Sequence, residues 1–286
     1  MKKIGVMANC RKAAAPAVLQ RLAERAAELG LQIYTCDACG KMLPGARRVS
    51  AATMAGQIDV LLALGGDGTF LRAVRALNGR DKPVLGVNLG SLGFLTSVTE
   101  QNLDRALDAL RRGKFRTSVR TMAECRVLRG RRQVAKYRAL NDIVVGWGIS
   151  SRVNTLALAV DGEPVAAYVC DGLIVSTPTG STGHSLSAGG PILHPASPSF
   201  VISIICPHIL TNRPLVVSDR SRITVSVVKA QKKLLLSVDG QEECAVQQGD
   251  RLEILRCARP ARFVHLPGYS YFSVLRHKLG WRGSNA

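Results

Sequence analysis

Short apolar runs alternate with segments of helical periodicity in the first third of the chain. Apolar residues recur every three or four positions in 14–29 and again in 70–77, which predicts two helices, and Gly30 ends the first of them. The strand-like runs are 3–8, 31–35, 58–64 and 83–87. The run 58–64 is almost continuously apolar, as in a strand buried on both faces. This alternation predicts a parallel sheet with helices packed on its faces, over residues 1–116.

The pattern changes after residue 116. Valine- and threonine-rich runs follow with little helical periodicity, and turn dipeptides such as Asp161-Gly162 and Asp239-Gly240 separate them. The predicted strands are 124–128, 142–145, 155–160, 172–176, 200–205, 221–229, 233–238 and 251–255. They predict an all-β domain, either a sandwich or a barrel, over 117–258. The stretch 271–281 has a helical pattern, and we expect the carboxyl-terminal helical segment 259–286 to pack back on the first domain.

The chain of 286 residues carries a net charge of +19, from 39 Lys and Arg against 20 Asp and Glu. Hydrophobic residues at 47% and charged residues at 21% exclude a disordered chain. The positive charge favours an anionic partner such as nucleic acid, a phosphorylated metabolite or a membrane surface, although a generally arginine-rich proteome explains it equally well. The sequence contains no apolar stretch of membrane-spanning length and no signal-peptide pattern, so we expect a cytoplasmic protein with no membrane partner.

The cysteines are scattered along the chain, several of them inside apolar runs, where a reduced thiol behaves as a small hydrophobic side chain. Cys36 and Cys39 form the one close pair in the sequence. A zinc site would need two further ligands, and no second CxxC or paired-histidine motif accompanies them. We therefore interpret this pair as part of an ordinary loop.

Basic residues gather between Arg111 and Arg138. Nucleic-acid binding would usually add aromatic residues for stacking, and only Phe115 and Tyr137 accompany them. Gly130 lies in the middle of the densest part of this stretch, which is typical of a hairpin tip. We interpret the basic stretch as a solvated hairpin and expect no nucleic-acid partner.

The first candidate site is the pentapeptide 65–69, GGDGT, which follows a buried strand and opens a helix. Glycines let the backbone approach a phosphate, and the start of a helix supplies N–H groups and a positive dipole. The sequence is neither a P-loop nor a GxGxxG fingerprint. Asp67 would repel a phosphate unless it holds a metal or takes a proton from a hydroxyl nucleophile. The alternative is a glycine-rich turn in which Asp67 caps the helix.

The second candidate site is the stretch 171–195, which is rich in serine, threonine and glycine and contains no Lys or Arg. Such a stretch is suited to lining a site for a polar ligand whose hydrogen-bonding edges are uncharged, such as a base and its ribose. Asn141-Asp142 precedes a neighbouring apolar run and offers an amide and a carboxylate, a usual pairing for sugar hydroxyls. By itself that pair is also compatible with a simple turn.

Taken together, these motifs resemble those of the bacterial NAD kinases, and the resemblance covers essentially the whole chain in order. The matching segments are GGDGT at 65–69, NLGSLGF at 88–94, Asn141-Asp142, the stretch 171–195, Arg213-Pro214, Asp239-Gly240-Gln241 and Leu279-Gly280-Trp281. GGDGT alone is shared with diacylglycerol and sphingosine kinases. The stretch 171–195 is much more specific to the NAD kinases.

The resemblance implies a Rossmann-like α/β amino-terminal domain, an all-β, sandwich-like carboxyl-terminal domain and an active site between them. It implies transfer of the γ-phosphoryl group of ATP to the 2′-hydroxyl of the adenosine ribose of NAD, which gives NADP. Mg²⁺ or another divalent cation would be carried with ATP, held by phosphate oxygens and water rather than by protein ligands. The resemblance further implies a homo-oligomer, either a dimer or a tetramer.

The same resemblance assigns roles to individual residues. Asp67 matches the general base, and Gly65 and Gly66 would face the ATP phosphates. Asn141 and Asp142 match an Asn-Glu pair that contacts NAD, and Asp171 matches a carboxylate that holds a ribose. The remaining residues expected to bind NAD are Gly68, Phe94, Arg152, Val169, Thr179, Thr182, Gly183, His184, Ser185, Leu186, Ser187 and Gln241.

Two residues depart from the family pattern. Asp142 stands where the family usually has Glu, which shortens the reach of the carboxylate by one methylene. Gly183-His184 stands where the family usually has Ala-Tyr, so a stacking tyrosine is replaced by a smaller ring that can also carry charge. Both changes bear on NAD affinity.

Three other functions remain compatible with parts of the sequence. A lipid kinase would share GGDGT, but it would need an apolar pocket for an acyl chain. A non-catalytic NAD(P)-binding regulator would not need Asp67. A nucleic-acid-binding module is supported by the net charge alone.

Overall fold

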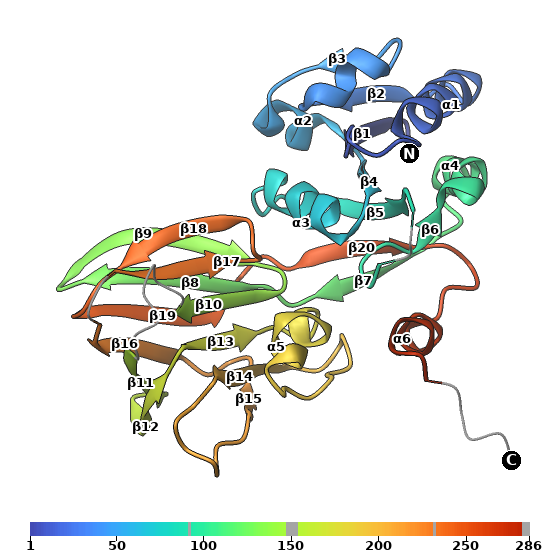
Figure 1. Ribbon diagram of the computed structural model, residues 1–286. Coiled ribbons are helices and arrows are strands. Elements are labelled where there is room, and N and C mark those ends of the chain that lie inside the picture. The colour runs from blue at the N-terminus through green and yellow to red at the C-terminus, as the bar shows by residue number, and fades with distance from the viewer. Residues whose placement is uncertain (91–92, 147–153, 231–232, 282–286) are drawn as a thin grey trace, which may run out of the picture. The chain divides into compact units, whose positions relative to one another are not determined.

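The computed structural model describes residues 1–90, 93–146, 154–230 and 233–281 (Figure 1). The chain forms two compact units. Unit 1 comprises Met1–Val119 and Ala261–Ala286, and unit 2 comprises Arg120–Pro260. No helix in the described ranges is long and apolar enough to cross a membrane.

Unit 1 is built on an eight-stranded sheet with the order β3-β2-β1-β4-β5-β20-β7, and β6 pairs with β5. Its first five strands pair in parallel, as the alternation of strands and helices predicted. The strands are β1 (Lys3–Ala8), β2 (Gln32–Thr35), β3 (Arg47–Arg48), β4 (Val60–Gly65), β5 (Pro83–Asn88), β6 (Val98–Thr99), β7 (Arg116–Arg120) and β20 (Ala261–His265).

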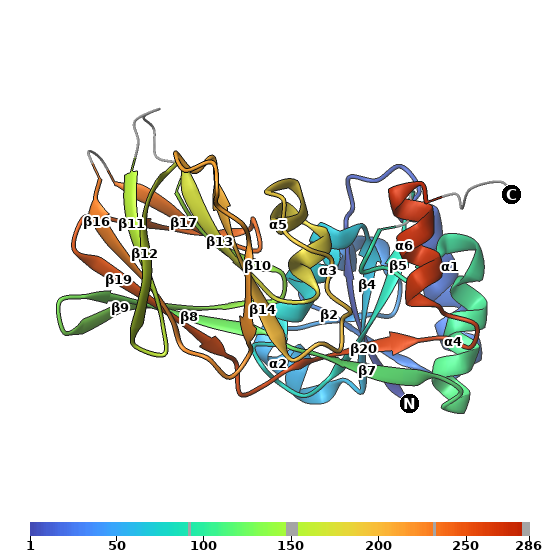
Figure 2. The same ribbon diagram turned by 90° about the horizontal axis from the view of Figure 1, so that it is seen from below.

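Five helices belong to unit 1 within the described residues. They are α1 (Ala15–Glu28), α2 (Ala51–Gln57), α3 (Asp67–Ala76), α4 (Leu103–Arg112) and α6 (Tyr271–Leu279), with short 3₁₀ turns at Ala38–Met42 and Glu100–Asn102. Helices α1 and α4 lie side by side (Figure 2) and are joined by the ion pairs Arg21–Asp104 and Arg25–Asp108. Alternate residues of β4, including Leu62 and Leu64, belong to the same apolar cluster as the inner faces of these helices.

The strand order determines where a ligand is expected in unit 1. The chain runs outward from β1 through β2 to β3 and then returns to place β4 on the other side of β1. The order therefore reverses between β1 and β4, and ligands of open α/β sheets bind at the carboxyl ends of the strands at such a point. Gly65 and Asp67 lie at that end of β4.

The carboxyl-terminal segment belongs to unit 1. The expectation of helix throughout 259–286 was wrong in its first part, because Ala261–His265 forms strand β20 and pairs in parallel with β5. Phe263 of this strand packs edge-on against Phe70 of α3, with ring centroids 4.5 Å apart. Helix α6 follows at Tyr271–Leu279, within the stretch that had a helical pattern.

Unit 2 consists of two six-stranded sheets, with the orders β15-β14-β13-β10-β17-β18 and β12-β11-β16-β19-β8-β9. The pairings within both sheets are antiparallel. The strands of the first sheet are β10 (Asp142–Gly146), β13 (Gly172–Ser176), β14 (Ser199–Ile205), β15 (Leu215–Ser218), β17 (Leu234–Val238) and β18 (Glu242–Val246). Those of the second are β8 (Ala123–Arg129), β9 (Arg132–Ala139), β11 (Asn154–Val160), β12 (Glu163–Cys170), β16 (Ile223–Lys229) and β19 (Asp250–Arg256).

The core of unit 2 lies between its two sheets. One apolar cluster contains Ile143 and Val145 of β10 together with Leu156 of β11 and Val225 of β16. Two sheets that share one core in this way form a sandwich. The structure therefore confirms the predicted α/β domain followed by an all-β, sandwich-like domain.

The basic stretch that ends at Arg138 includes a hairpin, as predicted. Strands β8 and β9 pair in antiparallel fashion up to Arg129 and Arg132, and Gly130 adopts a positive φ of 60° at the tip. Arg129 forms an ion pair with the buried Asp250 at 2.8 Å, so part of this positive charge is neutralised within the fold.

Candidate functional site

The pentapeptide 65–69 lies at the carboxyl end of β4 and begins α3. A side chain at Gly65 would overlap the Thr69 hydroxyl, so glycine is required there by close packing. A Cβ at Gly66 would meet nothing within 4 Å, so the backbone beside it faces open space. The first turn of α3 is therefore accessible to a phosphate.

Asp67 does not cap α3. The N-cap position belongs to Gly66, and the Asp67 carboxylate accepts the backbone N–H groups of Phe94 at 2.9 Å and Leu95 at 3.0 Å. The segment after β5 is thereby attached to the start of α3. A side chain at Gly93 would overlap the Asp67 carboxylate, so this glycine leaves the room that the carboxylate occupies.

Two basic side chains lie at the same edge of the unit 1 sheet. Arg72 donates to the carbonyl oxygen of Ala8 at 2.8 Å and pairs with Asp37 at 3.4 Å, so its guanidinium group is engaged by other groups of the fold. The exposed Lys12 ammonium lies 3.8 Å from the position that a Cβ on Gly90 would take, just beyond the end of β5. Lys12 makes no side-chain hydrogen bond or ion pair with the described residues, which leaves its charge available for a ligand.

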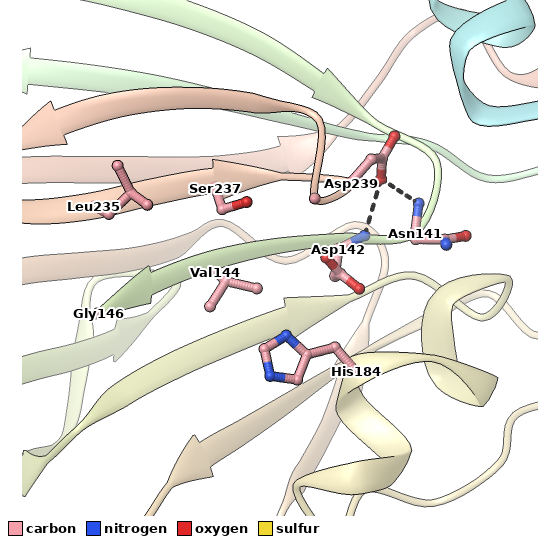
Figure 3. Close-up of a pocket in the computed structure, with 9 residues that line it drawn as sticks. Asn141, Asp142, Val144, Gly146, His184, Leu235, Ser237 and Asp239 are labelled. Atoms are coloured by element: carbon pink, nitrogen blue, oxygen red, sulfur yellow. Dashed lines mark hydrogen bonds between the residues drawn. The ribbon is translucent and has the colours of Figure 1, made fainter. Parts of the chain in front are cut away.

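Unit 2 contains a cavity of about 510 Å³ on the outer face of its first sheet, within the range typical of small-molecule sites. It is lined by Asn141, Asp142, Val144, Gly146, His184, Leu235, Ser237, Asp239 and Gly240 (Figure 3). The two-residue period of a strand explains this lining. Ile143 and Leu236 point into the core, so their neighbours Val144, Leu235 and Ser237 point outward into the cavity.

The walls of the cavity combine apolar and polar groups. Val144 and Leu235 form apolar walls, whereas Asn141, Asp142 and His184 bring an amide, a carboxyl group and an imidazole (Figure 3). The Oδ1 atom of Asn141 is buried and has no hydrogen-bond partner among the described residues. A buried polar atom without a partner is costly, and a ligand that donates a hydrogen bond to it removes that cost.

Asp142 carries a buried carboxyl group whose charged form is disfavoured by its surroundings. Burial, and after it the negative charge of Asp239, raise the pKa of the Asp142 carboxyl to about 7. The cavity therefore contains an acid that changes charge near neutral pH.

The stretch 171–195 contributes to this site in several ways. Its first part forms the buried strand β13, next to β10, and His184 begins the short helix α5 (His184–Ser187) after the turn Gly180–Thr182. Within the described residues, the buried Thr179 hydroxyl also has no partner. The Ser185 hydroxyl instead bonds to Ser203 at 3.1 Å inside the fold.

The other residues of this stretch that were expected to bind NAD lie close by in sequence. Thr182 is partly buried and donates to the carbonyl oxygen of Thr179 at 3.4 Å. Gly183 and Ser187 are exposed, and Leu186 is half-buried. None of these side chains lines the described cavity, which receives only His184 from this segment.

Four further residues were predicted to bind NAD. Val169 lies on β12 and is 39% exposed. Asp171 is exposed and directly precedes β13, whose first residues pair with the Gly146 end of β10. Gln241 ends the turn after β17, where its backbone N–H bonds to Val238 at 3.0 Å. Arg152 lies outside the described residues.

The sequence motifs assign no role to Asp239, although they include the Asp239-Gly240 turn. In the structure the Asp239 carboxylate accepts the backbone N–H groups of Asn141 at 2.7 Å and Asp142 at 3.2 Å (Figure 3). An Asp-Gly turn next to a strand end predicts a hairpin and contains no signal of this distant contact.

The Cys36–Cys39 pair forms part of an ordinary fold element. Cys39 is buried in the 3₁₀ turn after β2 and lies 3.2 Å from the Thr35 hydroxyl. No group of three or more His, Cys, Asp or Glu that could hold a metal ion occurs in the described part of the chain.

Comparison with known proteins agrees with the motifs. The family models described as ATP-NAD kinase N-terminal domain and ATP-NAD kinase C-terminal domain match residues 4–115 and 140–266. The NAD kinase of Syntrophotalea carbinolica is 38% identical over 282 residues, which covers 98% of this chain and 99% of that protein. The NAD kinase of Gemmatimonas aurantiaca is 40% identical, with 98% and 96% covered.

Solved structures give the same result. An NAD kinase from Archaeoglobus fulgidus in complex with ATP aligns with a TM-score of 0.76 and 26% identity, over 97% of both chains. A yeast NADH kinase complexed with NADH aligns with a TM-score of 0.92 over 100% of this chain and 89% of that one, and at 24% identity it supports the fold alone. With both family models matched and relatives similar over nearly its full length, the chain belongs to the ATP-NAD kinase family.

Proposed function

We propose that this protein is an NAD kinase that transfers the γ-phosphoryl group of ATP to the 2′-hydroxyl of the adenosine ribose of NAD. The observation that carries the proposal is the cavity of unit 2. Its apolar walls suit a base, and its amide, carboxyl group and imidazole suit the hydrogen-bonding edges of a base and ribose. The relatives named NAD kinase and the structure with bound ATP support the same pair of substrates.

Unit 1 supplies the groups that a phosphoryl donor needs. The open backbone at Gly66 and the start of α3 offer N–H groups, and Lys12 offers a positive charge that no described residue neutralises. GGDGT has no lysine of its own, unlike a P-loop, so a cation from another strand end is needed to bind the phosphates. We assign that role to Lys12.

A divalent cation bound to ATP would neutralise the charge that develops on the transferred phosphoryl group. The carboxylates at this edge do not form a metal cage. Both oxygens of Asp67 accept backbone N–H groups, and Asp37 accepts the N–H groups of Ala8 and Cys39. This donor set fits Mg²⁺ held by phosphate oxygens and water, and it offers no dedicated protein ligand.

Asp67 is suited to act as the general base. Each carboxylate oxygen has two acceptor positions, and the N–H groups of Phe94 and Leu95 occupy one on each oxygen. One position on each oxygen therefore remains for a ribose hydroxyl. The backbone bonds hold the carboxylate in a fixed orientation, which favours proton transfer.

The described structure gives less support to two of the alternative functions, the lipid kinase and the non-catalytic regulator. A lipid kinase would need a cavity that accepts an acyl chain, and although the walls of this cavity are mostly apolar, they include Asp142, His184 and an unpartnered amide oxygen. A binding protein without catalysis would not require the Asp67 carboxylate to be held in the orientation that a base needs.

We further propose that the protein acts in the cytoplasm as a dimer or tetramer. All eight cysteines are free thiols, as in a reducing compartment. Exposed apolar side chains of unit 2 include Ile209, Leu210 and Val216, and Leu210 is 97% exposed. Light scattering of the purified protein tests this, because a monomer at every concentration would exclude the oligomer.

The function is tested by offering NAD, NADH and diacylglycerol in parallel to the purified protein with labelled ATP. We expect label in the phosphorylated dinucleotide and none in the lipid. Lipid phosphorylation without NADP would support the lipid kinase, and NAD binding without any transfer would support the regulator.

A further inference from the structure

Asp239 lines the cavity and also accepts hydrogen bonds from the backbone beside it. It lies in the turn between β17 and β18, where Asp239 and Gly240 adopt positive φ angles of 53° and 63° and the N–H of Gln241 bonds to the carbonyl oxygen of Val238 at 3.0 Å. These features define a type I′ turn. The turn directs the Asp239 carboxylate toward the chain segment that precedes β10 (Figure 3).

Three consecutive backbone N–H groups donate to this single carboxylate. Leu140 donates to Oδ2 at 2.9 Å, and Asn141 and Asp142 donate to Oδ1 at 2.7 and 3.2 Å. In return, the N–H of Asp239 donates to the carbonyl oxygen of Asp142 at 3.0 Å. Charge-assisted bonds of this kind are stronger than neutral ones, so they fix the backbone from which two cavity side chains project.

The other side of the Asn141 backbone is fixed as well. Its carbonyl oxygen accepts the N–H of Thr177 at 2.9 Å, and a side chain at Gly180 would overlap it. Asn141 is therefore held between Asp239 and the segment after β13. Its side-chain amide is the part left to meet a ligand, and the Oδ1 atom of that amide has no partner among the described residues.

Asp239 also acts on Asp142 through its charge. The negative charge of Asp239 is, after burial, the second cause that raises the pKa of the Asp142 carboxyl. The titratable groups that line the cavity with Asp142 are Asp239, from the turn after β17, and His184, from α5. Across the sheet, Asp142 pairs with Ser176 of β13, which carries no charge.

From this arrangement we infer that Asp239 is a positioning residue of the NAD site, which orients Asn141 and Asp142 for the dinucleotide. The inference rests on the proposed function. It predicts two effects from one substitution, namely weaker NAD binding and a shifted titration of Asp142.

The test replaces Asp239 with Asn and compares it with a matched control. Asn tolerates the left-handed backbone of the turn, but its NH₂ group cannot accept a backbone N–H, and it carries no charge. Asp161→Asn is the control, because Asp161-Gly162 is also a hairpin turn, its φ is also 53°, and its carboxylate accepts the N–H of Arg222 at 2.7 Å. Asp161 does not line the cavity.

For Asp239→Asn we expect the KM for NAD to rise about tenfold to a hundredfold, as for the loss of a hydrogen bond to a charged group, while the KM for ATP and kcat change far less. Asp161→Asn should leave all three near their wild-type values. Equal NAD KM values in the two variants, or an equal loss for both substrates in Asp239→Asn, would overturn the inference.

A second measurement is made on the free protein and needs no substrate. Carbon NMR of the aspartate carboxyl groups follows the titration of Asp142, with Asp142→Asn used to assign its signal. We expect the Asp142 midpoint to move to lower pH in Asp239→Asn and to stay unchanged in Asp161→Asn. An unmoved midpoint would contradict the charge effect, whatever the kinetics show.

The two measurements separate the inference from the proposed function. If the wild-type protein forms no NADP, the proposed function fails, whereas the titration still tests the action of Asp239 on Asp142. If Asp239→Asn does not fold, hydrogen exchange in the wild-type protein provides the test. The N–H groups of Leu140, Asn141 and Asp142 should then be strongly protected, and fast exchange at all three would overturn the inference.

Discussion

The Asp67 carboxylate at the start of α3 accepts the backbone N–H of Phe94 at 2.9 Å. A second bond, to the N–H of Leu95 at 3.0 Å, completes the attachment of the segment after β5. The residue proposed as the general base therefore also organises the edge of the sheet at which it acts. Its substitution is expected to disturb both roles, so the experiments must separate them.

Asp67→Asn should lower kcat by about 10²–10⁴-fold, the usual contribution of a general base, while NAD still binds. One backbone N–H of Phe94 or Leu95 should also lose its acceptor, because the amide has a single acceptor oxygen. Calorimetry with NAD, turnover assays and amide exchange at Phe94 and Leu95 measure the three effects. Near-wild-type turnover would leave Asp67 with a structural role alone.

Gly93→Ala complements that variant, because it keeps the Asp67 carboxylate and displaces it. The added methyl group would overlap the carboxylate oxygen. We expect a clear loss of kcat together with a lower melting temperature, since overpacking costs about 1–3 kcal/mol. Unchanged kcat in Gly93→Ala would show that the position of the carboxylate is unimportant for catalysis.

Gly180→Ala should strongly destabilise unit 2. A Cβ at this position would overlap the backbone carbonyl group of Asn141. That carbonyl accepts the N–H of Thr177, and the N–H of Asn141 donates to Asp239, so the residue cannot move without breaking these bonds. The expected loss is about 1–3 kcal/mol or more in the free energy of unfolding. Gly183→Ala is the matched control, because its Cβ would meet only the carbonyl oxygen of Gly180, at 3.3 Å. Denaturant unfolding of both variants measures the difference, and equal losses would contradict the packing argument.

Asp142→Asn should alter the pH dependence of stability. Because the pKa of Asp142 in the folded protein is about 7, above its ordinary value, the folded state binds this proton more tightly than the unfolded state. The wild-type free energy of unfolding should therefore decrease as pH rises from about 4 to 7. Asp142→Asn removes this dependence and should be more stable at about pH 8, by on the order of 2–4 kcal/mol at most.

The measurement is urea unfolding of the wild-type protein and the variant at several pH values. The advantage of Asp142→Asn should shrink as the pH falls toward about 4, the ordinary pKa of Asp, because the wild-type carboxyl group is then protonated in the folded state and begins to be protonated in the unfolded state. An advantage that is constant with pH would show that it arises from packing rather than from ionisation.

Lys12→Met should weaken the use of ATP selectively. A hydrogen bond to a charged group contributes about 1.5–3 kcal/mol, so the KM for ATP should rise about tenfold to a hundredfold, with little change in the KM for NAD. Lys229→Met, which removes an exposed charge from unit 2, controls for the change in net charge. If both variants have the same KM for ATP, Lys12 does not contact the donor.

The local pattern of the sequence was sufficient to predict much of the fold. The apolar run 58–64 becomes β4, at Val60–Gly65, and the period of 14–29 becomes α1, at Ala15–Glu28. Strand β20 was missed because its short sequence, with Arg262 and His265 between apolar residues, resembles many surface segments. Its partner at Pro83 and Val84 lies far away in sequence, and only the folded chain brings them together.

The candidate site was likewise predictable only in part. The motif residues Asn141, Asp142 and His184 do line one cavity. The groups that hold them were not predictable, because Asp239 reaches Asn141 across 98 residues of sequence. Asp67 likewise reaches Phe94 across 27 residues, and no local spacing rule reveals such a contact.

We propose that this protein phosphorylates NAD at the 2′-hydroxyl of the adenosine ribose. The most direct measurement incubates the purified protein with NAD and ATP labelled at the γ phosphorus, and locates the label in the product by mass spectrometry and phosphorus NMR. We expect the label to appear as a 2′-phosphate, in NADP. Label at another hydroxyl, or unchanged NAD while a lipid acceptor is phosphorylated, would contradict it.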